Sequence, residues 1–219
     1  MKVVEFSHKL LIICFVLLGA FGQSSFAQSE KNALFENLNE TVFNFHEVTP
    51  NLYRSGLVTK ESVPYLKELG IKTVITFDND PERVRREEAF LQGSGIQLKS
   101  IPWSAWDSPE DETIRNIHAI INDPAMQPVL VHCKHGQERT GVTVATWRID
   151  QEHWDFDQAY GEMKVCGFRP VRFGHLKNYV YDFAQKHGHE EAKISRFERA
   201  KTNIFSFFYK FRKLSLFPK

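Results

Sequence analysis

The chain has 219 residues, of which 42% are hydrophobic and 25% are charged, with 12 glycines and 9 prolines. This composition excludes collagen-like, low-complexity and intrinsically disordered chains. The formal net charge is only +1, so we expect no nucleic-acid partner. The charge is unevenly spread, because residues 190–219 hold eight Lys or Arg against three Glu. A mildly acidic body therefore ends in a basic segment.

Residues 1–27 have the pattern of a secretory signal peptide. A basic start precedes the apolar run of residues 10–20, and residues 25–27 form a small-x-small cleavage site. The apolar run is shorter than the ~20 residues of a membrane span, which makes an uncleaved anchor the weaker alternative. We therefore predict cleavage near Ala27 and export to the periplasm or the medium.

The rest of the chain divides into a polar lead-in (28–42), one folded domain (43–189) and a C-terminal tail (190–219). The tail is rich in phenylalanine as well as basic. One hypothesis makes it an amphipathic helix in peripheral contact with an anionic membrane surface. The alternative is that its aromatic face packs back onto the domain. The sequence gives no indication of the oligomeric state.

The elements of the domain follow from local patterns. Alternating apolar and polar residues predict a half-buried strand over 43–48, and a β-branched run predicts a central strand over 71–77. Asp80 before Pro81 and Ser108 before acidic residues are signals for helix starts. Strands are expected over 43–48, 52–56, 71–77, 96–101 and 128–132, and helices over 59–69, 80–93, 108–122, 141–152, 155–165 and 175–187. This alternation predicts an α/β fold, with a central, mostly parallel twisted sheet flanked by helices.

The most informative segment spans residues 129–141, where a buried strand leads through a short loop into a helix. Such a loop presents backbone N–H groups and the positive end of the helix dipole, which suit a phosphate dianion. The same field favours the thiolate of Cys133 as a nucleophile. Arg139 can grip two phosphate oxygens with its planar fork. Gly136 permits close backbone approach, and the Thr140 hydroxyl can donate a hydrogen bond to Cys133 when it leaves as a thiolate.

The run His132-Cys133-x5-Arg139-Thr140-Gly141 resembles the signature of cysteine-dependent tyrosine and dual-specificity phosphatases. Residues 52–56 and 69–75 are similar to early segments of the compact atypical dual-specificity phosphatases, including bacterial ones. The resemblance extends over roughly residues 43–187. It implies a tyrosine-phosphatase-like fold, hydrolysis of phosphate monoesters through a phosphocysteine, and phosphate binding by the loop between strand and helix. The loop residues concerned are Lys134, His135, Gly136, Gln137, Glu138 and Arg139, with His132 and Thr140 in support.

Other functions remain possible from the residues alone. One is a catalytically silent phosphate-binding module, against which the intact Cys133 and Arg139 argue. Another is a thiol enzyme similar to rhodaneses or arsenate reductases, which would use a similar anion loop without the surrounding His132 and Thr140. A buried structural cysteine beside an ordinary surface arginine is the plainest alternative.

A phosphatase of this type needs a general acid that protonates the leaving oxygen and then acts as a base toward water. In the family this is an aspartate on a loop upstream of the signature, and Asp107 occupies that place. Flanking Trp106 would lower the local dielectric and help Asp107 keep a proton near neutral pH. Asp111 and Glu110 are substitutes. Glu138 is a further rival, since some phosphatases resembling the myotubularins use an acid just before the loop arginine.

The substrate is open between two classes. Lys134 and His135 add positive charge beside the phosphate, which favours an inositol polyphosphate over a protein phosphorylated on tyrosine, serine or threonine. Arg169 and Arg172 are candidate ligands for a second phosphate, or ordinary surface residues. Three aromatic residues could rim a phosphotyrosine pocket, namely Trp103, Trp106 and Tyr53.

We expect no cofactor and no metal, because the histidines lack the spacing of metal ligands. Residues 77–80 contain no arginine where related bacterial sequences often have one, so a substrate contact from this loop is in doubt. After export the remaining cysteines are Cys133 and Cys166. A disulfide between them would be a reversible off state that protects the nucleophile from over-oxidation. A buried, reduced Cys166 is the favoured alternative.

Overall fold

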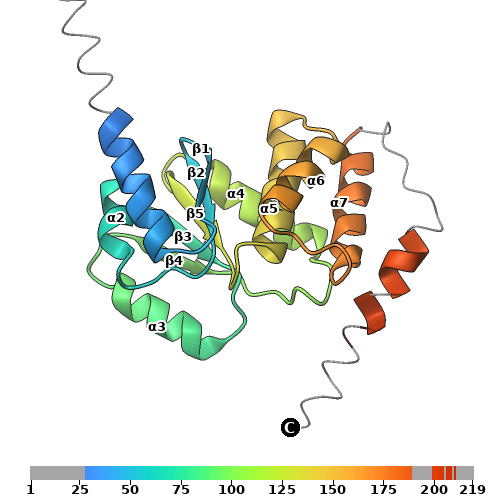
Figure 1. The fold of residues 1–219 in the computed structure, drawn as a ribbon, viewed down its shortest axis with the longest axis horizontal. Coiled ribbons are helices and arrows are strands. Elements are labelled where there is room, and N and C mark those ends of the chain that lie inside the picture. The colour runs from blue at the N-terminus through green and yellow to red at the C-terminus, as the bar shows by residue number, and fades with distance from the viewer. Residues whose placement is uncertain (1–27, 189–198, 205, 209, 211–219) are drawn as a thin grey trace, which may run out of the picture.

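The computed structural model describes residues 28–188, 199–204, 206–208 and 210. Its centre is a five-stranded sheet with the order β1-β2-β5-β3-β4. Only β1 runs antiparallel to its neighbour, which confirms the predicted mostly parallel sheet (Figure 1). The strands are β1 (His46–Thr49), β2 (Leu52–Ser55), β3 (Thr73–Thr76), β4 (Gln97–Ser100) and β5 (Val129–His132).

Helices cover both faces of this sheet (Figure 1). One face is covered by a helix of residues 28–41 together with α2 and α3, and the other by α4 to α7. Side chains alternate along β5, so that Leu130 joins the first core while Val129 and Val131 join the second. Strand β5 is therefore buried on both faces. The labelled helices are α2 (Val63–Glu68), α3 (Pro81–Leu91), α4 (Asp111–Asn122), α5 (Glu138–Glu152), α6 (Phe156–Val165) and α7 (Gly174–Lys186).

Several helix starts differ from the prediction. The Asp80 side chain does accept hydrogen bonds from Glu82 N–H and Arg83 N–H, as expected for an N-cap. Helix α4, however, begins at Asp111 with Glu110 as its N-cap residue, so Ser108 does not start it. Residues 59–62 precede α2 as a hydrogen-bonded turn. The largest difference is at α5, which begins at residue 138 instead of residue 141.

The segment that the sequence suggests is a polar lead-in, residues 28–42, is mostly helical. Leu34 and Leu38 lie one helical turn apart and are buried against the core that contains Phe45 and Tyr53. This apolar pair explains why an otherwise polar stretch packs as a helix on the sheet. The predicted signal peptide, residues 1–27, lies outside the described residues.

Residues 199–204, 206–208 and 210 of the tail are helical and lie beside α7 (Figure 1). Asn178 Nδ2 donates to Asn203 Oδ1 at 2.9 Å, and Arg199 pairs with Asp182 at 2.7 Å. This side of the tail is polar. Its apolar residues Ile204, Phe207 and Phe208 are each more than half exposed, so the expectation that the aromatic face packs onto the domain is wrong for these residues. The remainder of 190–219 lies outside the described residues.

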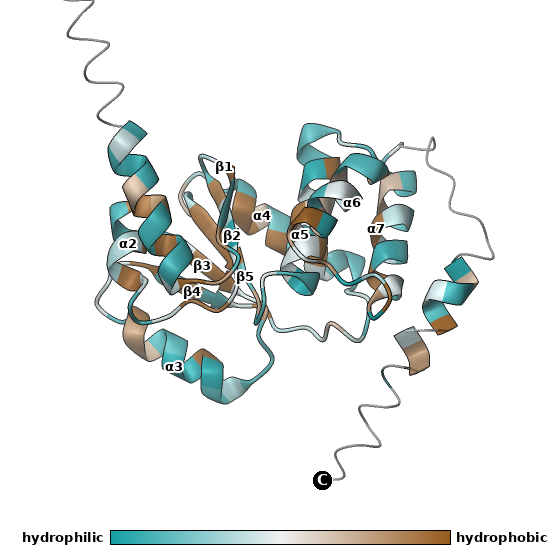
Figure 2. Ribbon diagram, viewed as in Figure 1, coloured by the Kyte–Doolittle hydropathy of each residue, from teal (hydrophilic) through white to brown (hydrophobic). Residues whose placement is uncertain are grey.

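The colouring by hydropathy follows the same layers, since β3 is hydrophobic whereas α3 is mostly hydrophilic (Figure 2). Helix α3 buries few side chains, chiefly Glu87 and Leu91. Within the described part of the chain, no helix is both long and apolar enough to cross a membrane. The parallel strands β2, β3 and β5 end at one edge of the sheet, and the loop that follows β5 leaves from that edge.

Candidate active site

The loop of residues 133–137 joins the buried end of β5 to the first turn of α5. Cys133 opens this loop and is only 2% exposed. The N-cap residue of α5, Gln137, makes no side-chain cap, and the first helical bond runs from Gly141 N–H to Gln137 O. The backbone N–H groups of the first turn have no acceptor within the helix and face the loop. A dianion bound in the loop would accept hydrogen bonds from them.

Gly136 is required by the shape of the loop. Its φ is +66°, and a Cβ at this position would lie 2.6 Å from the carbonyl carbon and oxygen of Ser55. Only glycine combines this conformation with such close contact to the end of β2. The loop therefore rests directly on the neighbouring strand.

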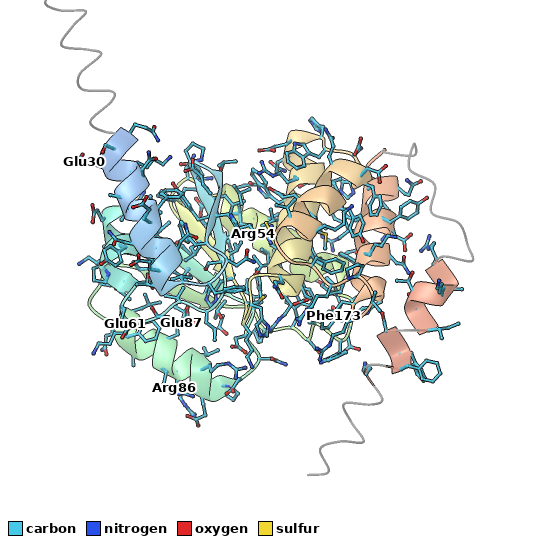
Figure 3. The ribbon with its side chains drawn as sticks, in the orientation of Figure 1. Glu30, Arg54, Glu61, Arg86, Glu87 and Phe173 are labelled. Carbon is cyan, nitrogen blue, oxygen red and sulfur yellow. The ribbon has the colours of Figure 1, made fainter. Side chains whose placement is uncertain are left out.

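Two side chains hold the loop from beneath. Arg54 Nη2 donates to Gly136 O at 2.9 Å, and Asn44 Nδ2 donates to the same oxygen at 3.0 Å. Asn44 Nδ2 also reaches Cys166 O at 3.0 Å, which ties the loop to the end of α6. Arg54 is buried between the sheet and α5 (Figure 3), and this burial lowers its pKa while Cys166 and Cys133 oppose the shift. Arg54 is thus a buried cation beneath the loop of residues 133–137, which we call the phosphate loop.

Arg139 lies in the first turn of α5 and connects three segments. Its Nη1 donates to Phe77 O, at the end of β3, and to Trp103 O at 3.2 Å. Trp103 belongs to the loop that carries Asp107. Arg139 therefore holds the acid-bearing loop against the phosphate loop, in addition to its predicted contact with phosphate.

Thr140 lies in the first turn of α5, and its Oγ1 is buried without a hydrogen-bond partner among the described residues. The predicted hydrogen bond to Cys133 concerns the sulfur when it leaves as a thiolate, and it stays a prediction.

Glu138 is buried, and its Oε1 accepts a hydrogen bond from Arg169 Nε at 2.7 Å. The bond from Glu138 raises the pKa of Arg169. This charge-assisted hydrogen bond makes Glu138 a tether between the loop and the segment after α6, and its role as a rival acid stays a prediction. The guanidinium of Arg172 lies 4.9 Å from the centre of the Trp106 ring, which places this second arginine beside the acid-bearing loop.

Lys134 and His135 are exposed at the loop surface, as expected for residues that meet a substrate. The expectation that both side chains add positive charge holds for Lys134 and not for His135. Partial burial lowers the pKa of His135, and the neighbouring Arg169 lowers it further. His135 is thus neutral near neutral pH in the ligand-free protein, and Lys134 supplies the positive charge at this point of the loop.

Asp107 lies where the family pattern predicts the general acid, on the loop between β4 and α4. Its side chain is 63% exposed, and Oδ1 lies 2.5 Å from Nζ of Lys210 in the tail. The ring of Trp106 packs on Phe173, with centroids 4.9 Å apart. Trp106 and Asp107 line the same cavity, and the effect of Trp106 on Asp107 stays a prediction. Asp107 lines a cavity of about 460 Å³ together with His175, Lys210 and other residues of α7 and the tail.

The substitute acids fit less well. Asp111 accepts hydrogen bonds from Lys186 Nζ at 2.7 Å and Tyr179 Oη at 3.1 Å, and these contacts lower its pKa. Glu110 is exposed at the start of α4. Asp111 lies in α4, beyond the loop that Arg139 contacts through Trp103, whereas Glu110 lies at the end of this loop, three residues after Asp107. The choice of Asp107 as the acid stays a prediction.

Comparison with known proteins shows the family of this chain. The model of the tyrosine phosphatase family matches residues 41–200, which is more than half of the chain. The chain belongs to the tyrosine phosphatase family. It is 32% identical over 154 residues to the dual specificity protein phosphatase TpbA of Pseudomonas aeruginosa, covering 70% of this chain and 68% of TpbA. It is 31% identical over 146 residues to the inositol diphosphatase DSP1 of Oryza sativa, covering 65% of each.

Solved structures of similar proteins agree with this family assignment. The crystal structure of TpbA has a TM-score of 0.55 at 28% identity and covers 77% of this chain and 91% of its own. A TpbA variant in complex with phosphotyrosine has a TM-score of 0.54 at 26% identity, with the same coverage. A Shewanella putrefaciens protein has a TM-score of 0.58 at 21% identity, which concerns the fold alone. This protein is therefore a phosphatase of the tyrosine and dual-specificity type.

The structure of this phosphatase also shows site residues that the sequence reasoning missed. Arg83 donates two hydrogen bonds to the buried Asp78, from Nε at 2.6 Å and from Nη2 at 2.8 Å. This pair places an arginine beside the loop after β3, where the sequence seemed to lack one. Arg54, Asn44 and Lys210 were missed because their partners lie 82 to 122 residues away in the sequence.

Both described cysteines of this phosphatase, Cys133 and Cys166, are free thiols and are buried. Burial raises the pKa of Cys166. Among the described residues, no three His, Cys, Asp or Glu side chains are grouped in a way that could hold a metal ion.

Proposed function

We propose that this protein is an exported phosphatase that hydrolyses phosphate monoesters through a phosphocysteine at Cys133, with an inositol polyphosphate as the favoured substrate. The observation that carries the proposal is the position of Cys133, which is buried at the start of a loop that opens onto the amides of α5. Arg139 lies in the first turn of the same helix. Membership of the tyrosine phosphatase family supports it.

In the first step the Cys133 thiolate attacks phosphorus, and the bond between phosphorus and the ester oxygen breaks. Protonated Asp107 gives its proton to the departing oxygen. The amides of α5 and the guanidinium of Arg139 stabilise the charge on the transferring phosphoryl group. Asp107 must leave Lys210 for this step, because its Oδ1 is held 2.5 Å from Nζ of that lysine.

In the second step Asp107, now a carboxylate, takes a proton from water, and the water oxygen attacks the phosphocysteine. The bond between phosphorus and sulfur breaks, phosphate departs, and Cys133 returns as a thiolate. Because Cys133 is buried, little of the sulfur of this intermediate faces bulk solvent.

The preference for an inositol polyphosphate rests on the cations around the loop. Lys134 is exposed within it, Arg169 is anchored beside it by Glu138, and Arg172 lies against Trp106. Several separated cations suit a substrate with several phosphates. The relative DSP1 of Oryza sativa, named an inositol diphosphatase, supports this class.

A phosphoprotein is the second candidate, favoured by a different observation. The TpbA variant was solved in complex with phosphotyrosine, and in this chain Trp103 and Trp106 lie on the loop that carries Asp107. An aromatic rim of this kind suits a phenyl ring.

The test compares phosphate release from inositol hexakisphosphate and from a phosphotyrosine peptide. We expect Cys133→Ser to abolish release from both substrates, with Glu88→Gln, an exposed acid on α3, as the matched control. We expect Arg172→Ala to raise KM for the inositol phosphate about tenfold while changing KM for the peptide less. An equal or larger effect on the peptide would reverse the substrate preference.

Export is part of the proposal and rests on the signal-like pattern of residues 1–27. Cell fractionation and N-terminal sequencing test it. We expect the mature chain to begin at Gln28 and to be found outside the cytoplasm. A cytoplasmic protein that retains Met1 would contradict export.

We also propose that the tail contacts an anionic membrane surface. Ile204, Phe207 and Phe208 are exposed on a segment whose polar side faces α7, and residues 190–219 are basic. Flotation with phosphatidylglycerol vesicles should recover the wild-type protein but not Phe207→Ser/Phe208→Ser. Equal recovery of both proteins would contradict this contact.

A further inference from the structure

The carboxyl group of Glu87 is buried, although the helix that carries it is largely polar. Glu87 is only 3% exposed, whereas the adjacent Glu88 is exposed. Figure 3 shows Glu87 on the side of α3 that faces the sheet and Arg86 on the outer side. Glutamate is seldom buried unless it is paired, so its partner is informative.

That partner is His132. Oε1 of Glu87 lies 2.7 Å from Nε2 of His132, whose side chain is completely buried. The two atoms are in close contact, although neither has a hydrogen-bond partner among the described residues. His132 is the last residue of β5 and directly precedes Cys133. A carboxyl group on α3 thus reaches, through one side chain, the residue that leads into the phosphate loop.

Burial explains why this contact matters. A buried carboxyl group without a polar neighbour is costly, and Nε2 of His132 is the polar atom that faces it at 2.7 Å. The contact then fixes the plane of the imidazole and the direction in which the chain leaves β5.

We propose that Glu87 is a positioning residue of this phosphatase, whose carboxylate holds His132 and, through it, Cys133 in the geometry for attack on phosphorus. The inference rests on the proposed function, in which Cys133 is the nucleophile. Glu87 does not itself touch the substrate. Its role requires that its effect on catalysis pass through His132.

A double-mutant cycle tests this route, with p-nitrophenyl phosphate as substrate and the variants Glu87→Gln, His132→Gln and the double variant. We expect Glu87→Gln to lower kcat about tenfold, equivalent to ~1.4 kcal/mol in the barrier, with KM changed less than about twofold. In the double variant kcat should equal that of His132→Gln alone. Once His132 is replaced, the carboxylate of Glu87 has no imidazole to hold, so its loss has no further effect. Glu88→Gln should behave as the wild type.

Two results would overturn the inference: kcat of Glu87→Gln within about twofold of the wild type, or effects that multiply fully in the double variant. If Glu87→Gln does not fold, kcat of the double variant is compared with kcat of His132→Gln. Equal values support the inference, and a lower kcat in the double variant overturns it. The variant Cys133→Ser separates this inference from the proposed function. Activity in Cys133→Ser would remove the phosphocysteine mechanism, whereas an inactive Cys133→Ser beside an unchanged Glu87→Gln removes only the role of Glu87.

Discussion

Nζ of Lys210 lies 2.5 Å from Oδ1 of Asp107, although the two residues are 103 positions apart. The contact joins the C-terminal tail to the loop proposed to carry the general acid. A carboxyl oxygen held by Lys210 is not free to face the leaving oxygen of a substrate, as a general acid must. The tail therefore competes with the first catalytic step as long as this ion pair is intact.

Lys210→Gln should raise kcat modestly, by about twofold to fivefold, because both side chains are partly solvated and the ion pair is weak. The increase should be larger at low ionic strength, where the pair is least screened. Lys201→Gln, which changes an exposed lysine of the same segment, is the control. A decrease in kcat would show that Lys210 assists the reaction instead.

Gly136→Ala should abolish activity and destabilise the fold by ~1–3 kcal/mol. The added Cβ would collide with the backbone of Ser55, and φ at this position is +66°. Gly161→Ala is a matched control, because its Cβ would meet nothing within 4 Å. Steady-state kinetics and urea unfolding measure the two effects. An active, stable Gly136→Ala would refute the account of the loop.

The acid is assigned by comparing Asp107→Asn with Glu138→Gln. We expect Asp107→Asn to lower kcat about 100-fold or more for a substrate with a poor leaving group. Glu138→Gln should mainly raise KM, since it loosens Arg169, and should leave kcat within about threefold. A loss of kcat confined to Glu138→Gln would transfer the acid role to Glu138.

Stability should decrease as the pH falls below about 6.5, and His118 should contribute to this decrease. Burial lowers the pKa of His118 in the folded protein, with Asp150 opposing the shift, so the unfolded chain takes up a proton at a higher pH. Its contribution to stability is thus present near pH 7 and above, and is reduced as the pH falls.

Urea unfolding at about pH 7.5 and pH 5.5 measures this dependence. His118→Gln should show a smaller difference in unfolding free energy between the two conditions. Some difference should remain, because His46, His135 and His175 have lowered pKa values as well. An unchanged difference in His118→Gln would contradict the assignment.

The fold and the phosphate loop could be predicted because their signals are local. A continuous apolar run predicts the buried strand β5, and the residues that follow it include the nucleophile, the glycine and the arginine of the loop. The sequence predicts the start of α5 three residues too late, because the motif places Glu138 and Arg139 in the loop although they have helical geometry.

The supporting contacts could not be predicted, because they join residues that only the fold brings together. Nothing near Glu87 in the sequence distinguishes it from Glu88, since both belong to a run of charged residues. Its burial is decided by the rotation of α3 on the sheet. Arg54 resembles an ordinary strand residue in the sequence, although its guanidinium lies beneath the phosphate loop.

The central claim is that catalysis passes through a phosphocysteine at Cys133, and intact-protein mass spectrometry tests it most directly. In Asp107→Asn, p-nitrophenyl phosphate should form the intermediate, because its leaving group needs no proton, while hydrolysis is slowed by loss of the base. After an acid quench we predict one added phosphoryl group on Cys133, and none in the double variant Cys133→Ser/Asp107→Asn. Phosphate release by Cys133→Ser at the wild-type rate, with no adduct on Cys133, would contradict the account.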